Sequence, residues 1–240
     1  MRVDVLGVGF DNMTMDQAVA EGVRLIGTEG AHYVVTPNPE IVEACRKDAE
    51  AMEAVNGADL VIADGIGVVY GAKILGTPLK GRLPGIEFAQ HLMERMARDG
   101  KTLFLLGSKP GVAELAAEKL VQSYPGLRIV GTHDGYFQED GPVTEAIRAT
   151  GADVVFVCLG APKQEKWMHQ NAQATGAHLL IGLGGCLDVF SGAVQRAPEI
   201  YQRLGLEWFH RLIKNPSRIG RMMKLPLFLV HVAGEKGKRK

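Results

Sequence analysis

Short apolar runs rich in β-branched residues alternate with helical stretches through the second half of this 240-residue chain. This alternation constrains the fold more than any other feature, because repeated βα units bury their strands in a parallel sheet with helices on both faces. The strand-like runs cover 102–106, 127–131, 153–158 and 178–183, and the helical stretches cover about 111–124, 142–150 and 163–175. The sequence therefore predicts an α/β fold with a Rossmann-like, mostly parallel sheet flanked by helices.

The first half predicts further elements of the same kind. Residues 2–8 alternate weakly as a strand, and the capping-box pattern at Thr14 and Gln17 opens a helix that ends near Gly27. A strand follows at 32–36. A helix then starts at Pro39 and ends at Gly57, and another covers 86–99.

Polar residues follow two of these strands at the point where each one ends. Asp64 ends the apolar run that starts at Asp59, and Thr36 and Asn38 follow the strand at 32–36. In open α/β sheets ligands bind outside the carboxyl ends of the strands, so we expect these three side chains to share one ligand site. The alternative is that Asp64 is only a helix N-cap or turn residue, since Asp-Gly is an ordinary turn dipeptide.

Four later strand ends carry glycine-rich or polar turns, of a kind whose backbone amides can bind a diphosphate. They are Gly107-Ser108-Lys109, Asp134-Gly-Tyr136, Gly160-Ala-Pro-Lys-Gln-Glu165 and Gly182-Leu-Gly184-Gly185-Cys-Leu-Asp188. The alternative for any one turn is that glycine serves tight geometry alone.

Familiar cofactor motifs are weak or missing in the sequence. Gly7-Val-Gly9 and Gly65-Ile-Gly67 resemble the start of a dinucleotide fingerprint, but Asn12 and Tyr70 stand where the third glycine belongs. No Walker A pattern and no Asp-x-Asp occur. We therefore expect neither a cofactor nor a bound metal.

The formal net charge is zero, yet the charges are unevenly distributed. Residues 196–240 hold 11 Lys and Arg against 3 acidic residues, a net of +8, so residues 1–195 carry −8. This break divides the chain into an α/β catalytic core, 1–195, and a basic, partly apolar helical appendage, 196–240, which suits an anionic partner. The apolar run 225–233 is too short to cross a membrane but could lie on one.

Three arginines of the appendage recur at spacings of seven and three: Arg211, Arg218 and Arg221. They share one helical face if a helix continues through Pro216. An ordinary solvated basic face is the alternative. Nothing at the start of the chain suggests a secretion signal, and the three scattered cysteines fit a reducing compartment. We expect a cytoplasmic protein that lies peripherally on the inner face of the cell membrane.

Together these motifs resemble the bacterial WecG/TagA/CpsF glycosyltransferase family. The residues that carry the resemblance span most of the chain in family order: Thr36-Pro-Asn-Pro-Glu40, Ala63-Asp-Gly65, Arg82-Leu-Pro-Gly85, Leu105-Leu-Gly-Ser108, Gly160-Ala-Pro-Lys-Gln-Glu165 and Gly184-Gly-Cys-Leu-Asp188.

The resemblance implies a metal-independent, inverting transfer of N-acetylmannosamine from UDP-ManNAc to GlcNAc-diphospho-undecaprenol, a step of teichoic acid linkage-unit synthesis. It implies Asp64 as the catalytic base, and Thr36 as a residue that positions the sugars. The remaining residues expected to bind substrate are Asn38, Arg82, Gly107, Ser108, Tyr136, Gln164, Glu165, Gly184, Gly185, Asp188, Arg211, Arg218 and Arg221. Of these, Asp188 is the one expected at the uracil, and the arginines of the appendage are expected at the diphosphate.

The expected partners are a UDP-sugar donor, a polyprenyl-diphosphate-linked GlcNAc acceptor and the membrane surface, with self-association as a further expectation. Two alternatives stay open. The chain could transfer another sugar from UDP for a capsule or exopolysaccharide. More remotely, it could be a non-catalytic nucleotide- or nucleic-acid-binding module, although the appendage has no evident recognition motif, and we expect no nucleic-acid partner.

Overall fold

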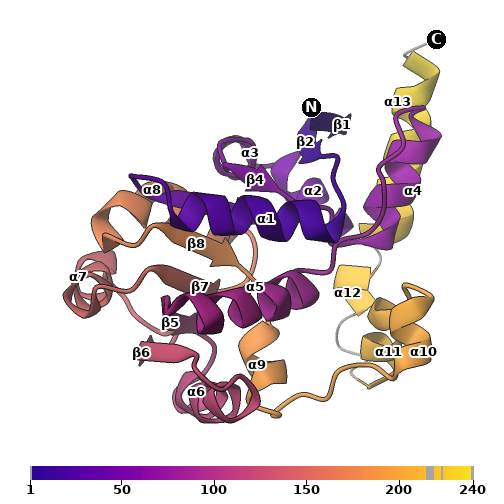
Figure 1. The fold of residues 1–240 in the computed structure, drawn as a ribbon. Coiled ribbons are helices and arrows are strands. Elements are labelled where there is room, and N and C mark those ends of the chain that lie inside the picture. The colour runs from indigo at the N-terminus through magenta and orange to yellow at the C-terminus, as the bar shows by residue number, and fades with distance from the viewer. Residues whose placement is uncertain (1, 215–218, 223, 239–240) are drawn as a thin grey trace.

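The computed structural model describes residues 2–214, 219–222 and 224–238. Its centre is a six-stranded, wholly parallel sheet with the strand order β4-β3-β8-β7-β5-β6 (Figure 1). The predicted parallel α/β fold is therefore confirmed. The strands are β3 (His32–Val35), β4 (Leu60–Val61), β5 (Thr102–Gly107), β6 (Arg128–His133), β7 (Val154–Cys158) and β8 (Leu179–Gly182).

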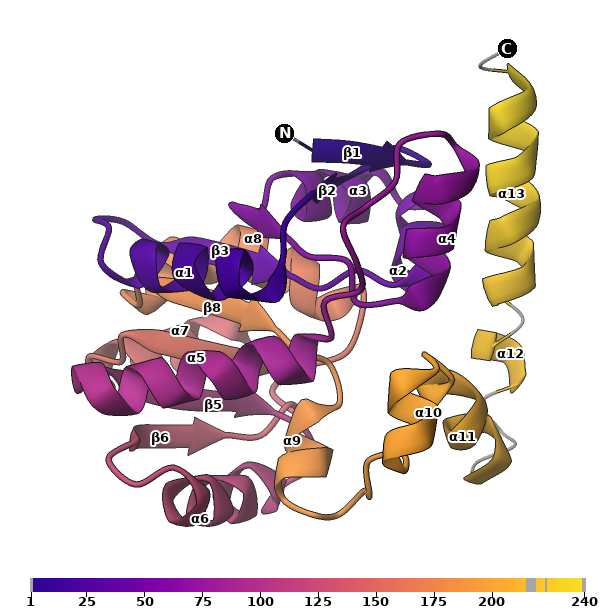
Figure 2. The ribbon, with the colours of Figure 1, turned by 45° about the vertical axis from the view of Figure 1, so that its right-hand side comes forward.

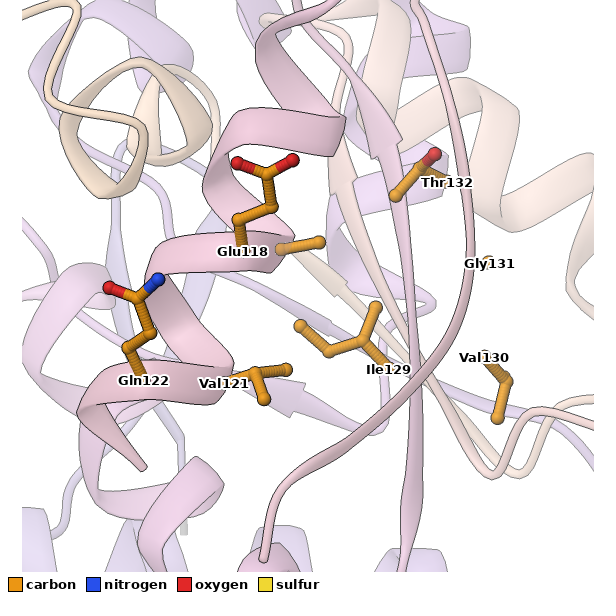
Figure 3. Close-up of a pocket in the computed structure, with 8 residues that line it drawn as sticks. Glu118, Val121, Gln122, Ile129, Val130, Gly131 and Thr132 are labelled. Atoms are coloured by element: carbon orange, nitrogen blue, oxygen red, sulfur yellow. The ribbon is translucent and has the colours of Figure 1, made fainter. Parts of the chain in front are cut away.

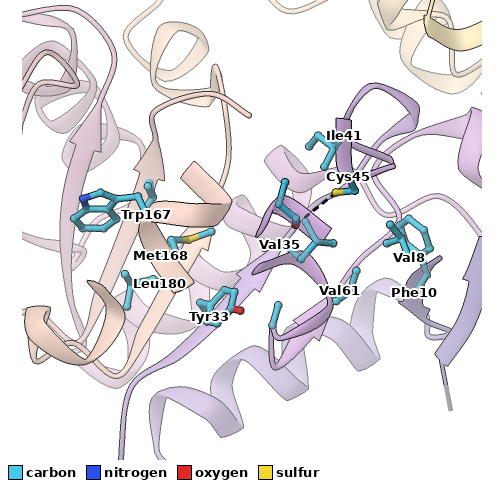
Figure 4. Packing of buried hydrophobic residues seen from close by; sticks show 14 of the residues in the cluster. Val8, Phe10, Tyr33, Val35, Ile41, Cys45, Val61, Trp167, Met168 and Leu180 are labelled. Carbon is cyan, nitrogen blue, oxygen red and sulfur yellow. Dashed lines mark hydrogen bonds between the residues drawn. The ribbon is translucent and has the colours of Figure 1, made fainter. Parts of the chain in front are cut away.

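Two apolar clusters hold helices onto the two faces of this sheet. One face packs against α1 (Met15–Ile26), α5 (Gly85–Asp99), α6 (Val112–Ser123) and α9 (Cys186–Phe190). The other face packs against α2 (Pro39–Cys45), α3 (Ala49–Asn56), α4 (Ile66–Ile74), α7 (Asp140–Thr150) and α8 (Lys163–Thr175). Figure 4 shows this second cluster, in which Tyr33, Val35 and Met168 meet.

The neighbouring strands β3 and β8 mark where ligands enter such a fold. The chain leaves β3 toward α2 and α3 on one face, and leaves β8 toward α9 on the opposite face. Adjacent strands whose connections diverge in this way open a crevice at their carboxyl ends. The fold therefore places a binding crevice beside Thr36, as the strand ends predict.

Two N-terminal predictions are wrong in detail. The strand expected at 2–8 is an antiparallel hairpin of β1 (Arg2–Val5) and β2 (Val8–Asp11), because Leu6 and Gly7 both take positive φ and turn the chain. The single helix expected from Pro39 to Gly57 is two helices, because the Asp48 side chain accepts a hydrogen bond from the Ala51 amide and starts α3 afresh.

The described residues of the appendage form four short or medium helices at the side of the sheet toward which the strands point (Figure 2). Gly205, with a φ of 68°, separates the first two. Pro226 does not divide the last helix, since it lies in the first turn, where no intrahelical N–H bond is lost. The helices are α10 (Glu199–Arg203), α11 (Glu207–Lys214), α12 (Ile219–Met222) and α13 (Lys224–Lys238).

Helix α13 returns to the core and lies beside α4. Phe228 and Val232 are fully buried within the larger apolar cluster, and the Phe228 ring sits where a Cβ on Gly71 would come within 2.9 Å. Part of the apolar run at 225–233 therefore packs on protein, while Leu227 and Val230 are exposed. None of the described helices is both long and apolar enough to cross a membrane.

Candidate active site

Three loops that follow β3, β4 and α4 are joined by backbone hydrogen bonds. The Asp64 amide donates to Pro37 O at 3.2 Å, and the Leu83 amide donates to Ala63 O at 2.8 Å. A Cβ on Gly65 would lie 2.7 Å from the Pro39 ring, so only glycine allows the first two loops to approach so closely. The sequence-predicted residues Thr36, Asn38, Asp64 and Arg82 are in this way held on adjoining loops.

A cavity of about 320 Å³ opens between these loops, the turns after β7 and β8, and the appendage. It brings together seven of the fifteen residues predicted at the site. The predicted residues among its lining are Thr36, Asn38, Asp64, Arg82, Gln164, Gly184 and Gly185; the appendage adds Gly205, Glu207, Trp208 and Leu225.

Of the two simple roles considered for Asp64, helix cap and turn residue, the cap role does not apply to α4. That helix is capped at Gly65, without any side-chain hydrogen bond. Asn38, in contrast, does cap a helix, since its Oδ1 accepts the Ile41 amide at the start of α2 at 3.1 Å. Asn38 therefore has a structural task in addition to its place on the cavity wall.

Two buried side chains on the β3 and β8 side of the cavity have their hydrogen bonds fixed by the backbone. The Thr36 hydroxyl donates to Gly182 O at 2.9 Å, so it offers lone pairs, not a proton, to a ligand. The Gln164 Oε1 accepts the Gly184 amide at 2.9 Å, and its Nε2 donates to Glu165 Oε1 at 2.9 Å.

Glu165 was expected to contact substrate, but its side chain is fully buried and does not line the cavity. Burial raises the pKa of this carboxyl group and outweighs the hydrogen bond from Gln164, which lowers it. Its Oε2 has no hydrogen-bond partner among the described residues.

Arg82 belongs to a four-charge network that joins the core to the appendage. Its Nη2 lies 2.9 Å from Glu207 Oε1, and Arg196 Nη2 lies 3.3 Å from the same oxygen and 2.5 Å from Glu87 Oε1. Burial alone would raise the pKa of Glu207, but the hydrogen bond from Arg82 and the charge of Arg196 hold that pKa below its usual value. Sequence reasoning missed Glu207. The one sequence feature that could have indicated it is its acidic side chain within a basic segment.

Asp188, the residue predicted at the uracil, is not part of the cavity lining and lies in the first turn of α9, just after Gly185. The Ser108 hydroxyl donates to Asp188 Oδ1 at 2.7 Å. Ser108 has a φ of 61°, and Gly107 before it has a φ of 127°, where a Cβ would lie 2.3 Å from Cys158 O. Tyr136 is exposed on the neighbouring loop, whose Gly135 amide donates to Ser108 O at 2.9 Å. The structure thus gathers Ser108, Tyr136 and Asp188 at the ends of β5, β6 and β8.

The prediction that Arg211, Arg218 and Arg221 share one helical face depends on residues outside the described ranges. Arg211 is in α11 and Arg221 is in α12, whereas Pro216 and Arg218 lie outside the described residues. The shared basic face therefore stays a prediction.

A metal-binding group and a second hollow are the other places where a ligand could bind. Within residues 2–214, 219–222 and 224–238, no three His, Cys, Asp or Glu side chains form a metal-binding group. A shallow hollow of about 570 Å³ lies between α6 and the edge strand β6, lined by Glu118, Val121, Gln122 and Ile129 among others (Figure 3). It contains none of the residues predicted from the sequence, so the cavity at Asp64 is the candidate active site.

A parallel α/β sheet with a carboxylate, an amide and an arginine at its ligand-binding edge suits an enzyme that acts on an anionic substrate. Comparison with known proteins specifies the family. Residues 3–240 match the model of the Glycosyl transferase WecG/TagA/CpsF family, and the chain belongs to this family.

Curated relatives carry a more specific name. Proteins of Staphylococcus aureus strains MW2 and NCTC 8325 are named N-acetylglucosaminyldiphosphoundecaprenol N-acetyl-beta-D-mannosaminyltransferase. Each is 37% identical to this chain over 242 residues, covering 100% of this chain and 94% of the relative. The family predicted from the motifs is confirmed.

Proposed function

We propose that this protein transfers N-acetylmannosamine from UDP-ManNAc to GlcNAc-diphospho-undecaprenol with inversion at the sugar carbon. The names of the 37%-identical relatives support this donor and acceptor. The observation that carries the proposal is the single cavity in which Thr36, Asp64, Arg82 and Gln164 meet the appendage.

An inverting displacement needs one base on the side opposite to the leaving group. We assign that role to Asp64, which would take the proton from the acceptor hydroxyl as this oxygen attacks the sugar. Thr36 suits a role in positioning the sugar. Its hydroxyl proton is donated to Gly182 O, so its lone pairs can accept a hydrogen bond from a sugar hydroxyl.

The departing UDP must be stabilised as negative charge develops on its diphosphate. In this proposal the Gln164 amide, Arg82 and the backbone of the turns at 160–161 and 184–185 meet it inside the cavity. The uracil then extends toward Asp188 and Tyr136. Arg211, Arg218 and Arg221 are proposed to add positive charge from the appendage, and no metal ion is required.

The appendage is also proposed to rest on the membrane that holds the lipid acceptor. Large apolar side chains are exposed on it, including Ile200 at 64% and Ile213 at 57% exposure. Trp208 and Leu225, on the same segment, line the cavity itself. An apolar surface within a basic segment suits an anionic lipid surface, which fits a peripheral position on the inner face of the membrane.

Transfer of a different UDP-sugar would use the same residues, so the donor needs its own test. The purified protein is incubated with GlcNAc-diphospho-lipid, EDTA and one donor: UDP-ManNAc, UDP-GlcNAc or UDP-glucose. The mass of the lipid product is then measured by mass spectrometry. The proposal predicts an added N-acetylhexosamine from UDP-ManNAc at a rate well above the other two. A higher rate with another donor would assign that sugar instead, and a requirement for Mg²⁺ would contradict the metal-independent mechanism.

A further inference from the structure

Gln164 is the one cavity residue whose amide is held at both ends by other groups of the protein. The Gly184 amide is a donor, so the atom that it meets must be the Gln164 carbonyl oxygen. The Gln164 nitrogen then carries two hydrogens, of which one goes to Glu165 Oε1. Among the described residues no acceptor meets the second hydrogen, and Gln164 lines the cavity.

The amide nitrogen of Gln164 needs a hydrogen-bond acceptor on the side away from the cavity. A side chain at that place must accept the Gln164 hydrogen bond without offering a proton of its own to the amide nitrogen. Glu165 Oε1 meets this need, although burying an acid with an unpartnered second oxygen costs stability. An apolar residue would fill the same place without that cost, which points to a task other than stability.

We propose that Glu165 is a positioning residue, which holds the Gln164 amide so that its remaining N–H faces the cavity as a donor to an oxygen atom of the UDP-sugar. The inference rests on the proposed function for the identity of the ligand, but the orientation of Gln164 does not. Glu165 itself touches no substrate in this arrangement. Burial raises the pKa of its carboxyl group, which favours the neutral form.

The test compares E165Q, E165L and Q164A in transfer assays. E165Q keeps a carbonyl oxygen for Gln164 and should recover at least about a third of the wild-type kcat/KM, whereas E165L should lose about tenfold to a hundredfold, the scale of one misplaced hydrogen-bond donor. Because Glu165 is proposed to act through Gln164, adding E165L to Q164A should cause less than about a twofold further loss. Additive losses in the double variant would overturn the proposal.

Thermal stability separates this role from a purely structural one. The folded protein keeps the Glu165 proton at pH values where the unfolded chain, with a pKa near 4.5, has lost it. Native stability contributed by this group therefore falls as pH rises above about 4.5, and the advantage in melting temperature of E165L and E165Q over wild type should grow in the same direction. The neighbouring Cys45 thiol does not interfere, because burial raises its pKa to about 12, with the nearby Glu165 adding to the rise. If E165L were less stable than wild type and lost activity in parallel, Glu165 would be structural.

A second readout keeps this test separate from the donor question. UDP alone raises the melting temperature of any form that binds it, so the shift at a fixed UDP concentration measures the site without turnover. The inference predicts a smaller shift for E165L and Q164A and a near wild-type shift for E165Q. This pattern without any sugar transfer would overturn the proposed function and leave the positioning role intact, while equal shifts in all four proteins would overturn the positioning role.

Discussion

Arg82 and Glu207, 125 residues apart in the sequence, form a 2.9 Å ion pair at the wall of the cavity. The pair joins the loop before α5 to the first turn of α11, and Arg196 shares the same Glu207 oxygen. The position of the appendage over the cavity therefore depends on charges that are partly shielded from water.

The first prediction concerns this pair. E207A leaves two partly buried arginines without their shared carboxylate and should lower the free energy of unfolding by about 3 kcal/mol, measured by urea denaturation. E21A is the matched control, because the Arg24–Glu21 pair is equally short at 2.7 Å but lies on the surface of α1. If the free energy of unfolding of E207A were as close to wild type as that of E21A, the network would not hold the appendage.

The return of α13 to the core gives a second prediction. Phe228 is fully buried against Gly71, so F228A should cost about 3–5 kcal/mol of stability. V230A, two residues along the same helix, removes a side chain that is 66% exposed and should change stability by less than about 0.5 kcal/mol. Similar denaturation midpoints for the two variants would contradict the packing of α13 on α4.

The contact between Ser108 and Asp188 leads to a third prediction. Ser108 adopts a strained left-handed backbone and uses its hydroxyl to orient Asp188 at the proposed uracil position. S108A should weaken UDP binding by about fivefold to tenfold in calorimetry, the effect of losing one hydrogen bond. S123A removes a hydroxyl that bonds only Lys119 O on an exposed helix turn, and it should bind UDP as the wild type does. Unchanged UDP affinity in S108A would remove Asp188 from the uracil site.

Membrane association supplies a fourth prediction. Replacing Ile200 and Ile213 together by serine removes two exposed apolar side chains of the appendage and should reduce binding to vesicles that contain anionic lipid by about tenfold or more. Leu115 and Val121 are also exposed but lie on α6, so their replacement by serine is the control. Equal losses in a vesicle sedimentation assay would show that the appendage is not the membrane-facing surface.

Sequence reasoning located the site because its signals are local. Apolar runs that stop at Thr36 and Asp64 place both residues at strand ends, and parallel strands bring those ends to one edge whatever the rest of the chain does. The sequence also indicated the turn glycines at 107 and 184, and both take positive φ in the structure.

Features that depend on contacts between residues far apart in the sequence could not be predicted from local patterns. The break before α3 is an exception, because it depends on a local aspartate cap at Asp48 that interrupts an otherwise helical pattern. The burial of Phe228 depends on Gly71, and the role of Glu207 depends on Arg82, and neither pairing leaves a local pattern. The sequence placed Glu165 beside Gln164 but could not tell that one lines the cavity and the other lies behind it.

The most direct test of the central claim compares wild type with D64N for UDP release from UDP-ManNAc, with GlcNAc-diphospho-lipid and EDTA present. Asp64 is proposed to remove the acceptor proton, so D64N should keep the wild-type UDP affinity and melting temperature while turnover falls by about 10²- to 10⁴-fold. In the wild type, release should depend on the acceptor and survive EDTA. Acceptor-dependent release by D64N at the wild-type rate would contradict the assignment of Asp64 as the base.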